Sequence, residues 1–225
     1  MKILAFDTST KFLSIACLED SEVLSSYHEE VGIRHSEILV SKMKEIIKEP
    51  GWRKTDIDLV CTGLGPGSFT GLRIAVATIK GLAAVLSNKV VGVPTMDAIV
   101  KNVSGTQKRV APLLNAYKGK VYSCIYEREN DKVIRTTDYL LLPVEDLLDG
   151  LQDEVLFFGD AIEMYRDKLE EHPLAKYSCD LDWYPKAADI GRIGFEMSLK
   201  GTDDPGSIDP LYLHAKECNI ISRGS

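Results

Sequence analysis

Short apolar runs alternate with turn signals along the first hundred residues. Residues 3–6 form an apolar run suited to a central strand, residues 12–18 alternate more loosely, and residues 23–27 follow a Glu-Asp-Ser turn signal. A helix is predicted over residues 36–48, where apolar residues recur at helical spacing before a Pro-Gly pair stops it. The same reasoning predicts a buried strand at 57–62, a helix at 68–86, a strand at 90–93 and a helix beginning at 95–100.

The second half repeats this order of elements. A shift of 108 positions places Ala5-Phe6-Asp7 on Leu113-Leu114-Asn115, so both halves are predicted to run βββαβα. Two lobes follow, residues 1–108 and residues 109–225, with a last helix at 187–199 that we expect to pack back on the first lobe. The elements predicted for the second lobe are strands at 110–115, 121–126, 133–141 and 155–158 and helices at 144–148 and 161–169.

A strand that ends in an acid or amide and turns into a tight hairpin occurs twice. This arrangement resembles the actin-like ATPase superfamily, so we expect an α/β, two-lobed fold of the ASKHA, ribonuclease H-like class. In that superfamily the two hairpin tips bind nucleotide phosphates and an acid holds the metal. Here Asp7, Thr8 and Ser9 follow the first strand without the usual glycine, and Asn115 is a weak metal ligand. Asp7 as a cap of its own turn is an equally good interpretation.

The most distinctive string is GLGPGSFTGLR at residues 63–73, between a buried strand and a long helix. Backbone amides at such a helix start can bind an anion, which predicts a vestigial phosphate site. The string lacks the Gly-Lys-Ser/Thr of a Walker loop and the spacing of a dinucleotide fingerprint, and it has Pro66 where a hydrolase elbow needs a glycine. A structural turn with Ser68 or Thr70 as N-cap is the alternative. The candidate anion-site residues are Asp7, Thr8, Ser9, Gly65, Gly67, Ser68 and Thr70.

The helix predicted at 68–86 is apolar around nearly its whole circumference and rich in alanine and glycine. One apolar face can pack on a sheet, and the remaining apolar face must then be buried against another element. Small residues let a second helix approach closely. A helix buried within a larger monomer has the same pattern, but a lobe of this size supplies about two layers. The pattern therefore favours a subunit interface.

Composition and charge narrow the possible partners. The 225 residues carry a formal net charge of −7, and 44% of them are hydrophobic, as expected of a folded globular chain. Residues 1–110 carry 14 Lys and Arg against 12 Asp and Glu, whereas residues 111–225 carry 13 against 22. Since phosphate backbones are bound mainly through Lys and Arg, we expect this chain to contact nucleic acid only indirectly.

The cysteines and histidines give no metal or disulfide pattern. No C-x-x-C or H-x-x-x-H occurs, which favours free thiols in a reducing compartment. The apolar run after Met1 is too short for a signal peptide, and glycines interrupt the weakly charged stretch 59–88, so neither secretion nor a membrane span is expected. We expect a cytoplasmic protein without metal. The cysteines are Cys17, Cys61, Cys124, Cys179 and Cys218.

Five segments together resemble the TsaB family, also called YeaZ: residues 3–10, 35–39, 63–75, 81–83 and 210–213. The resemblance implies a catalytically silent relative of TsaD that binds and positions TsaD together with the ATPase TsaE. Those proteins transfer a threonylcarbamoyl group to N6 of adenosine 37 in tRNAs whose codons begin with A. The resemblance also implies no cofactor on this chain, ATP and metal on the partner subunits, and a homodimer in isolation.

The family places its interface on a helix bundle, which here corresponds to the helices predicted at 36–48 and 68–86. Family members commonly have Asp-Ala-Arg where Asn115-Ala116-Tyr117 stands and Arg where His214 stands, which weakens the case for a bound nucleotide. A stand-alone ATP-binding or ATP-hydrolysing enzyme, with Asp7 as its metal acid, is the alternative function. The residues expected at the partner interface are Leu39, Met43, Ile46, Ile74, Ala77, Thr78, Gly81, Leu82 and Val85.

Overall fold

The computed structural model describes residues 1–129 and 132–213, so His214 and Cys218 lie outside the described residues. The chain divides into two compact units. The first combines Met1–Ala98 with Tyr184–Tyr212, and the second consists mainly of Ile99–Trp183. This division falls ten residues before the boundary expected at 108, and the chain returns to the first unit after the second.

The first unit is built on a five-stranded sheet with the order β3-β2-β1-β4-β5. The first three strands form an antiparallel meander, and β4 and β5 run parallel to β1. These elements agree with the predicted βββαβα order to within a few residues. Their bounds are β1 Lys2–Asp7, β2 Phe12–Glu19, β3 Glu22–Glu30, α1 His35–Lys48, η1 Lys54–Asp56, β4 Leu59–Gly63, α2 Phe69–Leu86, β5 Lys89–Val93, α3 Thr95–Ile99 and α6 Ala187–Ser198.

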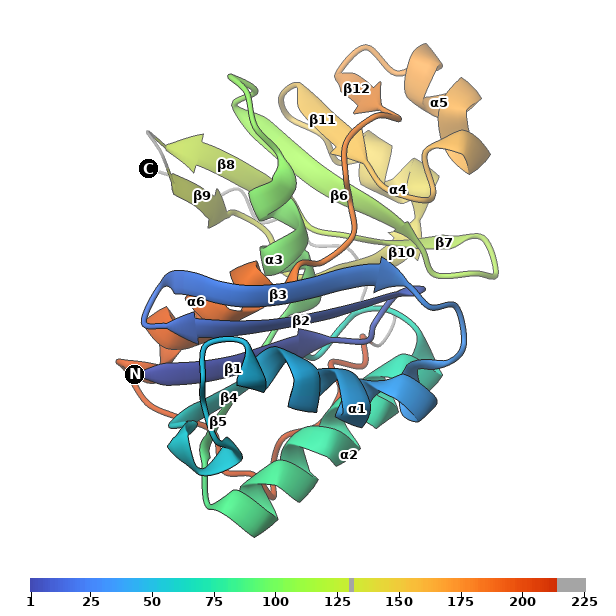
Figure 1. Ribbon diagram of the computed structural model, residues 1–225. Helices are drawn as coiled ribbons and strands as arrows, with labels where there is room; N and C mark the ends of the chain where they lie inside the picture. Colours follow the sequence, from blue (N-terminus) through green and yellow to red (C-terminus); the bar gives the residue numbers. More distant parts are fainter. Residues whose placement is uncertain (130–131, 214–225) are drawn as a thin grey trace. The chain divides into compact units, whose positions relative to one another are not determined.

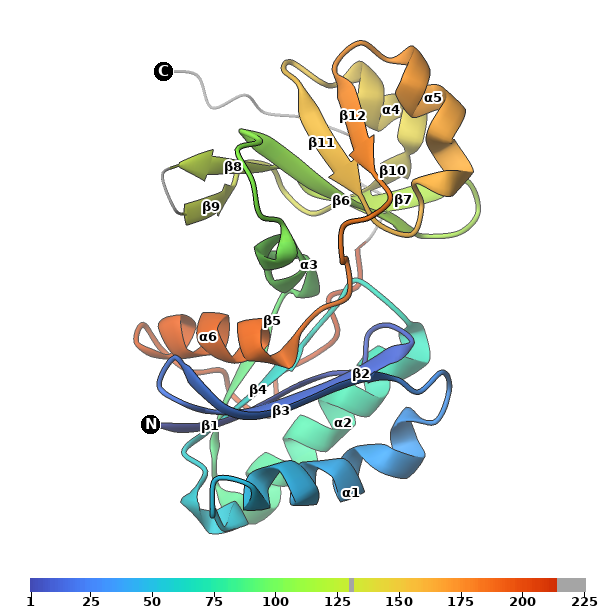
Figure 2. The same ribbon diagram turned by 45° about the horizontal axis from the view of Figure 1, so that its top comes forward.

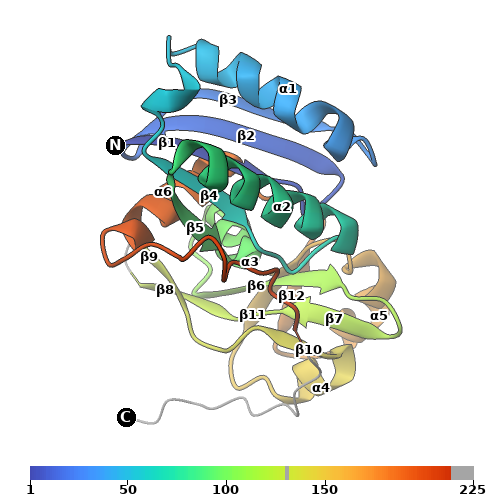
Figure 3. The same cartoon turned by 90° about the horizontal axis from the view of Figure 1, so that it is seen from below.

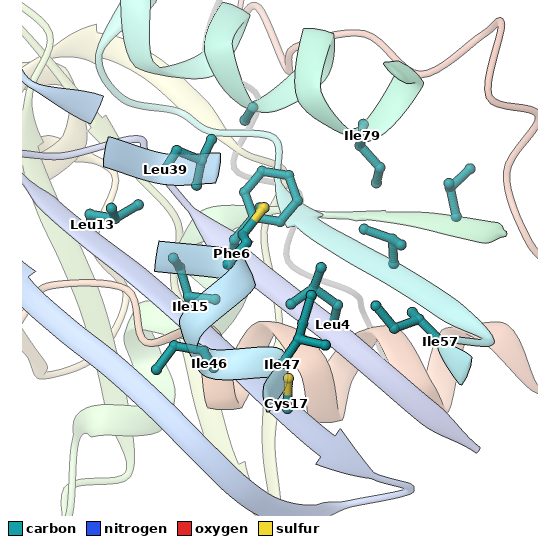
Figure 4. Close-up of a cluster of buried hydrophobic side chains, with 14 of the residues drawn as sticks. Leu4, Phe6, Leu13, Ile15, Cys17, Leu39, Ile46, Ile47, Ile57 and Ile79 are labelled. Atoms are coloured by element: carbon teal, nitrogen blue, oxygen red, sulfur yellow. The ribbon is translucent and has the colours of Figure 1, made fainter. Parts of the chain in front are cut away.

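Both faces of this sheet are covered, because side chains along a strand alternate between its two sides. Leu4 and Phe6 of β1 point toward α1 and α2 and pack with residues such as Leu39 and Ile79 (Figure 4). The residues at alternate positions, Ile3 and Ala5, pack on the other face, which α6 covers (Figures 1 and 2). The Ala187 amide at the start of α6 donates to Ser14 Oγ over 2.8 Å. Figure 3 shows α1 and α2 side by side over their face of the sheet.

The second unit has a sheet with the corresponding order β10-β7-β6-β11-β12, to which β8 and β9 add a hairpin through β6. Its first strand, β6, runs antiparallel to β7 and parallel to β11. The element bounds are η2 Val100–Asn102, β6 Arg109–Asn115, β7 Lys120–Ser123, β8 Tyr126–Glu129, β9 Lys132–Arg135, β10 Leu140–Pro143, α4 Val144–Asp149, β11 Val155–Phe158, η3 Glu163–Tyr165, α5 Arg166–Glu171 and β12 Ala175–Ser178.

Two strands predicted in the second unit are each divided in the structure. Residues 121–126 form β7 and the start of β8, and residues 133–141 form parts of β9 and β10. The breaks occur where Thr136 Oγ1 donates to the Ile125 carbonyl over 3.0 Å and the Ile125 amide donates to Thr137 Oγ1 over 3.0 Å. These side chains replace ladder hydrogen bonds, so each strand can change its partner at this point.

Helix α2 is long and apolar enough to span a membrane when judged by length and composition alone. Of the glycines that were expected to interrupt such a span, Gly63, Gly65 and Gly67 precede the helix, whereas Gly71 lies in its first turn without breaking it. Its buried residues, including Leu72, Ala75 and Ile79, pack in the first unit. The remaining residues of α2 are exposed or half-buried, so the helix packs on the sheet with one face only.

The fold class is therefore confirmed. Each unit carries a meander of three strands, a helix, a parallel strand, a second helix and a further parallel strand, with matching strand orders in the two sheets. This duplicated α/β arrangement is the one expected for the actin-like, ribonuclease H-like class.

Candidate functional site

The tip of the β1–β2 hairpin is closed on itself. Asp7 is 1% exposed, and its Oδ1 accepts hydrogen bonds from the Ser9 amide at 2.8 Å and the Ser9 hydroxyl at 2.7 Å. This is an Asx turn, in which a carboxylate satisfies the backbone two residues ahead. Thr8 and Ser9 are likewise buried. Asp7 thus acts in this structure as the cap of its own turn.

The glycine-rich loop after β4 closes over this tip. A Cβ atom on Gly63 would overlap Asp7 Oδ2, and one on Gly71 would overlap the Thr8 carbonyl oxygen. The Thr8 hydroxyl donates to the Gly71 carbonyl over 2.8 Å, and the Ser68 amide donates to the Ser9 carbonyl over 2.7 Å. The glycines therefore permit close contact between the loop and the hairpin, which is a structural reason for their presence.

Burial raises the pKa of Asp7, and the hydrogen bonds from Ser9 and Thr95 counteract part of that effect. Thr95 Oγ1 donates to Asp7 Oδ2 over 3.4 Å and accepts from the Gly65 amide over 2.9 Å. The positive charge of a protonated His35 also favours the carboxylate. Asp7 therefore links β1, the glycine-rich loop and α3, and its oxygens are engaged within the first unit.

The structure brings the seven predicted anion-site residues together around the hairpin tip and the glycine-rich loop. Ser68 is the N-cap of α2, with Oγ accepting from the Gly71 amide over 3.3 Å, and Thr70 is exposed. Ser9 directs its amide and hydroxyl to Asp7. Within residues 1–129 and 132–213, no group of three His, Cys, Asp or Glu side chains is placed to hold a metal ion.

Helix α2 carries an exposed apolar face opposite its buried one. Ala77, Gly81 and Ala84 are exposed, and Val85 is 77% exposed. Ile74, Thr78 and Leu82 are half-buried and flank this face. The face runs from Ala77 to Val85 along α2, and it is the exposed part of the predicted interface.

The expectation for α1 needs correction. Leu39, Met43 and Ile46 are only 1%, 4% and 5% exposed and belong to the core between α1 and the sheet. Figure 4 shows Leu39 and Ile46 among the buried side chains. Helical spacing of apolar residues indicates that a face is covered, but it does not say whether a partner or the chain's own sheet covers it. In this structure the sheet covers these three residues.

Three residues near the start of α2 were not predicted. Arg73 lies over the Phe69 ring, 3.8 Å from its centroid, and the Tyr212 ring centroid lies 5.8 Å from that of Phe69. Phe69 is 54% exposed and Tyr212 is 45% exposed. Phe69 and Arg73 stand four residues apart on a predicted helix, and this spacing indicates that they share a face. No local signal in the sequence links them to Tyr212.

Comparison with known proteins identifies the family. The sequence model described as TsaD, tRNA N6-adenosine threonylcarbamoyltransferase, matches residues 21–185. The chain belongs to the TsaD family, among its TsaB (YeaZ) proteins. The TsaB protein of Escherichia coli is 28% identical over 95% of this chain and 94% of its own length. The TsaB protein of Bacillus subtilis is 26% identical over 76% of each chain.

Structural similarity extends over the whole fold. The structure of YeaZ from Pseudomonas aeruginosa matches with a TM-score of 0.79 and 27% identity, covering 94% of this chain and 99% of that one. Both sequence relatives are named tRNA threonylcarbamoyladenosine biosynthesis protein TsaB. Family membership therefore assigns the chain to tRNA threonylcarbamoyladenosine biosynthesis, as an accessory protein.

Proposed function

We propose that the chain is a non-catalytic subunit that binds and positions TsaD, together with TsaE, for threonylcarbamoyl transfer to N6 of adenosine 37 in tRNAs reading codons that begin with A. The observation that carries this proposal is the exposed apolar face of α2, which includes Ala77, Gly81 and Val85. Soluble proteins rarely leave such a face without a partner. Family membership supplies the class of partner.

The composition of this face suits a helix of another protein. Ala77 and Gly81 stand one helical turn apart, and nothing lies within 4 Å of the position that a Cβ on Gly81 would take. Small exposed side chains let two helices approach closely and pack over a long distance. The same face would hold a second copy of the chain when TsaD is absent, which is the homodimer we expect in isolation.

The proposal leaves chemistry to the partner subunits. Asp7, the acid that would hold a metal in an actin-like ATPase, is engaged by Ser9 and Thr95 and its pKa is raised by burial. ATP and metal are expected on TsaE and TsaD. The net charge of −7 favours tRNA contact through the complex over direct binding by this chain, which we expect to act in the cytoplasm.

Co-purification with TsaD and a tRNA modification assay test the proposal. We expect Ala77→Glu to abolish the complex and to lower modification to the level measured without this chain, because the partner would have to bury an uncompensated charge. Ile134→Glu is the matched control, because Ile134 is 44% exposed on β9 in the second unit. Complex formation by both variants alike would contradict the proposal.

The alternative of a stand-alone ATP-binding enzyme is tested by calorimetry with Mg-ATP on the isolated chain. We expect no heat of binding at micromolar concentrations, because the hairpin tip uses Asp7 and Ser9 for its own turn. Micromolar binding that is lost in Asp7→Ala would favour the enzyme over the scaffold.

A further inference from the structure

The cluster of Arg73, Phe69 and Tyr212 lies at the start of α2 and is open to solvent. Arg73 is exposed, and it makes no ion pair with any residue that the structure describes. Its guanidinium is held over the Phe69 ring at 3.8 Å, and Tyr212 extends the aromatic surface. Aromatic and arginine side chains arranged in this way are typical of the residues that contribute most to protein interfaces.

Stacking on Phe69 restricts the guanidinium without using up its N–H donors. A planar guanidinium over an aromatic ring interacts through its face, and its edge keeps the fork of donors that fits a carboxylate. A bidentate pair with a carboxylate is stronger than a single hydrogen bond, and its geometry is better defined. Arg73 is therefore already oriented to bind an acidic side chain.

The charge pattern of α2 makes Arg73 distinctive. Arg73 and Lys80 are the only charged residues of α2, whose residues are all described. Lys80 Nζ already pairs with Asp209 at 3.3 Å and donates to the Gly206 carbonyl over 3.2 Å. No Asp or Glu occurs between Asp58 and Asp97 in the sequence. A second copy of this chain, placed with its α2 against this one, offers Arg73 no carboxylate from that helix.

Four residues of α2 follow one another at intervals of four and so lie on one side of the helix: Phe69, Arg73, Ala77 and Gly81. We propose that Arg73, held by Phe69, selects the partner of this face by binding an Asp or Glu side chain of a different protein, and thereby favours that protein over a second copy of the chain. This inference rests on the proposed function, since it concerns the same face of α2. Complementary charge gives interfaces specificity as well as affinity.

A protein carboxylate fits this cluster better than an RNA phosphate does. RNA binding depends on several cations acting together, whereas Arg73 is the one charge of α2 that has no ion pair with a described residue. The row of residues beyond Arg73 is apolar and would meet nothing similar on a phosphate backbone. Binding of a single-stranded RNA oligonucleotide that is lost in Arg73→Glu would overturn the proposal.

The first experiment measures the affinity of the full chain for TsaD by calorimetry at low and high salt. We expect Arg73→Glu to weaken binding about tenfold or more and Arg73→Ala to weaken it about threefold. Salt should weaken the wild-type complex more than the Arg73→Ala complex, because screening acts on a charge pair. Lys200→Glu is the control, since Lys200 is exposed after α6, which covers the other face of the sheet. It makes the same charge change.

The second experiment measures self-association of the isolated chain by sedimentation. We expect Arg73→Ala to self-associate at least as tightly as the wild type, and a mixture of wild type and Arg73→Glu to associate more tightly than wild type alone. If the wild type fails to bind TsaD, the proposed function fails. If the wild type binds TsaD but Arg73→Glu binds equally well or self-association weakens in Arg73→Ala, only the assignment of Arg73 is wrong.

Discussion

The two units contain equivalent hairpin tips with opposite exposure. In the first, Asp7 Oδ1 accepts from the Ser9 amide at 2.8 Å, and in the second, Asn115 Oδ1 accepts from the Tyr117 amide at 2.8 Å. Thr8 is fully buried at the first tip, whereas Tyr117 is 75% exposed at the second. The same local turn therefore ends in a packed core in one unit and in solvent in the other.

The segments that follow the fourth strand of each sheet account for the difference. After β4 the glycine-rich loop closes over the tip and leads into α2, which has 18 residues. After β11 the chain continues through Gly159 and Asp160, and Asp160 Oδ1 accepts a hydrogen bond from the Asn115 amide over 2.8 Å. The helix that follows, α5, has only 6 residues. The closing loop and the long apolar helix occur together, so among the described residues the first unit combines a sealed tip with an exposed apolar helix face.

The largest effect is expected where the loop meets the first tip. Gly63→Ala should lower the free energy of unfolding by about 3 kcal/mol, because its Cβ would overlap the buried Asp7 carboxylate. Gly119→Ala at the second tip should cost about 1 kcal/mol, since Gly119 has open space but a φ of +74°. Urea denaturation of both variants measures the contrast. Equal costs would mean that the loop does not press on the first tip as described.

Removing the capping side chain should come next. Asp7→Ala should destabilise the first unit by about 2 kcal/mol, because the Ser9 and Thr95 donors lose a buried acceptor. Asn115→Ala, at a half-exposed position, should cost about 0.5 kcal/mol, since water can replace the amide. Chemical denaturation distinguishes the two, and a larger cost for Asn115→Ala would reverse the comparison.

The pH dependence of stability should differ between the tips. The pKa of Asp7 is raised by burial, so its folded-state pKa lies above the unfolded one. Its contribution is therefore present at low pH and is lost as the pH rises through the raised pKa. Asp7→Asn should remove this loss. The melting temperature of the variant, measured relative to that of the wild type, should therefore rise from pH 4 to neutral pH. At the second tip, burial also raises the pKa of Asp160, but Asp160 is exposed, so Asp160→Asn should show a gain of the same sign and smaller size.

The smallest effect is expected from backbone strain at the open tip. Lys118 has a φ of +53°, a conformation that costs an L-residue more than a glycine. Lys118→Gly should therefore raise the free energy of unfolding by about 0.5 kcal/mol. Lys120→Gly, within β7, should instead lower it by about 0.5 kcal/mol, because glycine weakens a strand. A stabilising Lys120→Gly would show that strain does not explain the first result.

The order of elements was predictable because hydrophobic spacing and turn residues are local signals. The strands around Asp7 and the helix after the glycine string were predicted to within a few residues for this reason. The division of 133–141 into β9 and β10 was not predictable, since it depends on two hydrogen bonds of Ile125, one accepted from the Thr136 hydroxyl and one donated to Thr137 Oγ1, about ten residues away.

The candidate site was predicted in part. The exposed face of α2 was expected because the helix is apolar on all sides, but burial of Leu39 by the sheet could not be separated from burial by a partner. Tyr212 reaches Phe69 only through the returning segment of the chain. Contacts between residues so far apart in sequence depend on the tertiary fold, which local spacing does not reveal.

The return of the chain to the first unit also sets an order of folding during synthesis. Residues 1–98 contain the whole sheet of the first unit, but α6, which covers one face of it, begins at Ala187. Ile99–Trp183, which form most of the second unit, are synthesised in between. A ribosome therefore releases most of the second unit while one apolar face of the first sheet is still open, and that face is closed only when α6 has been translated.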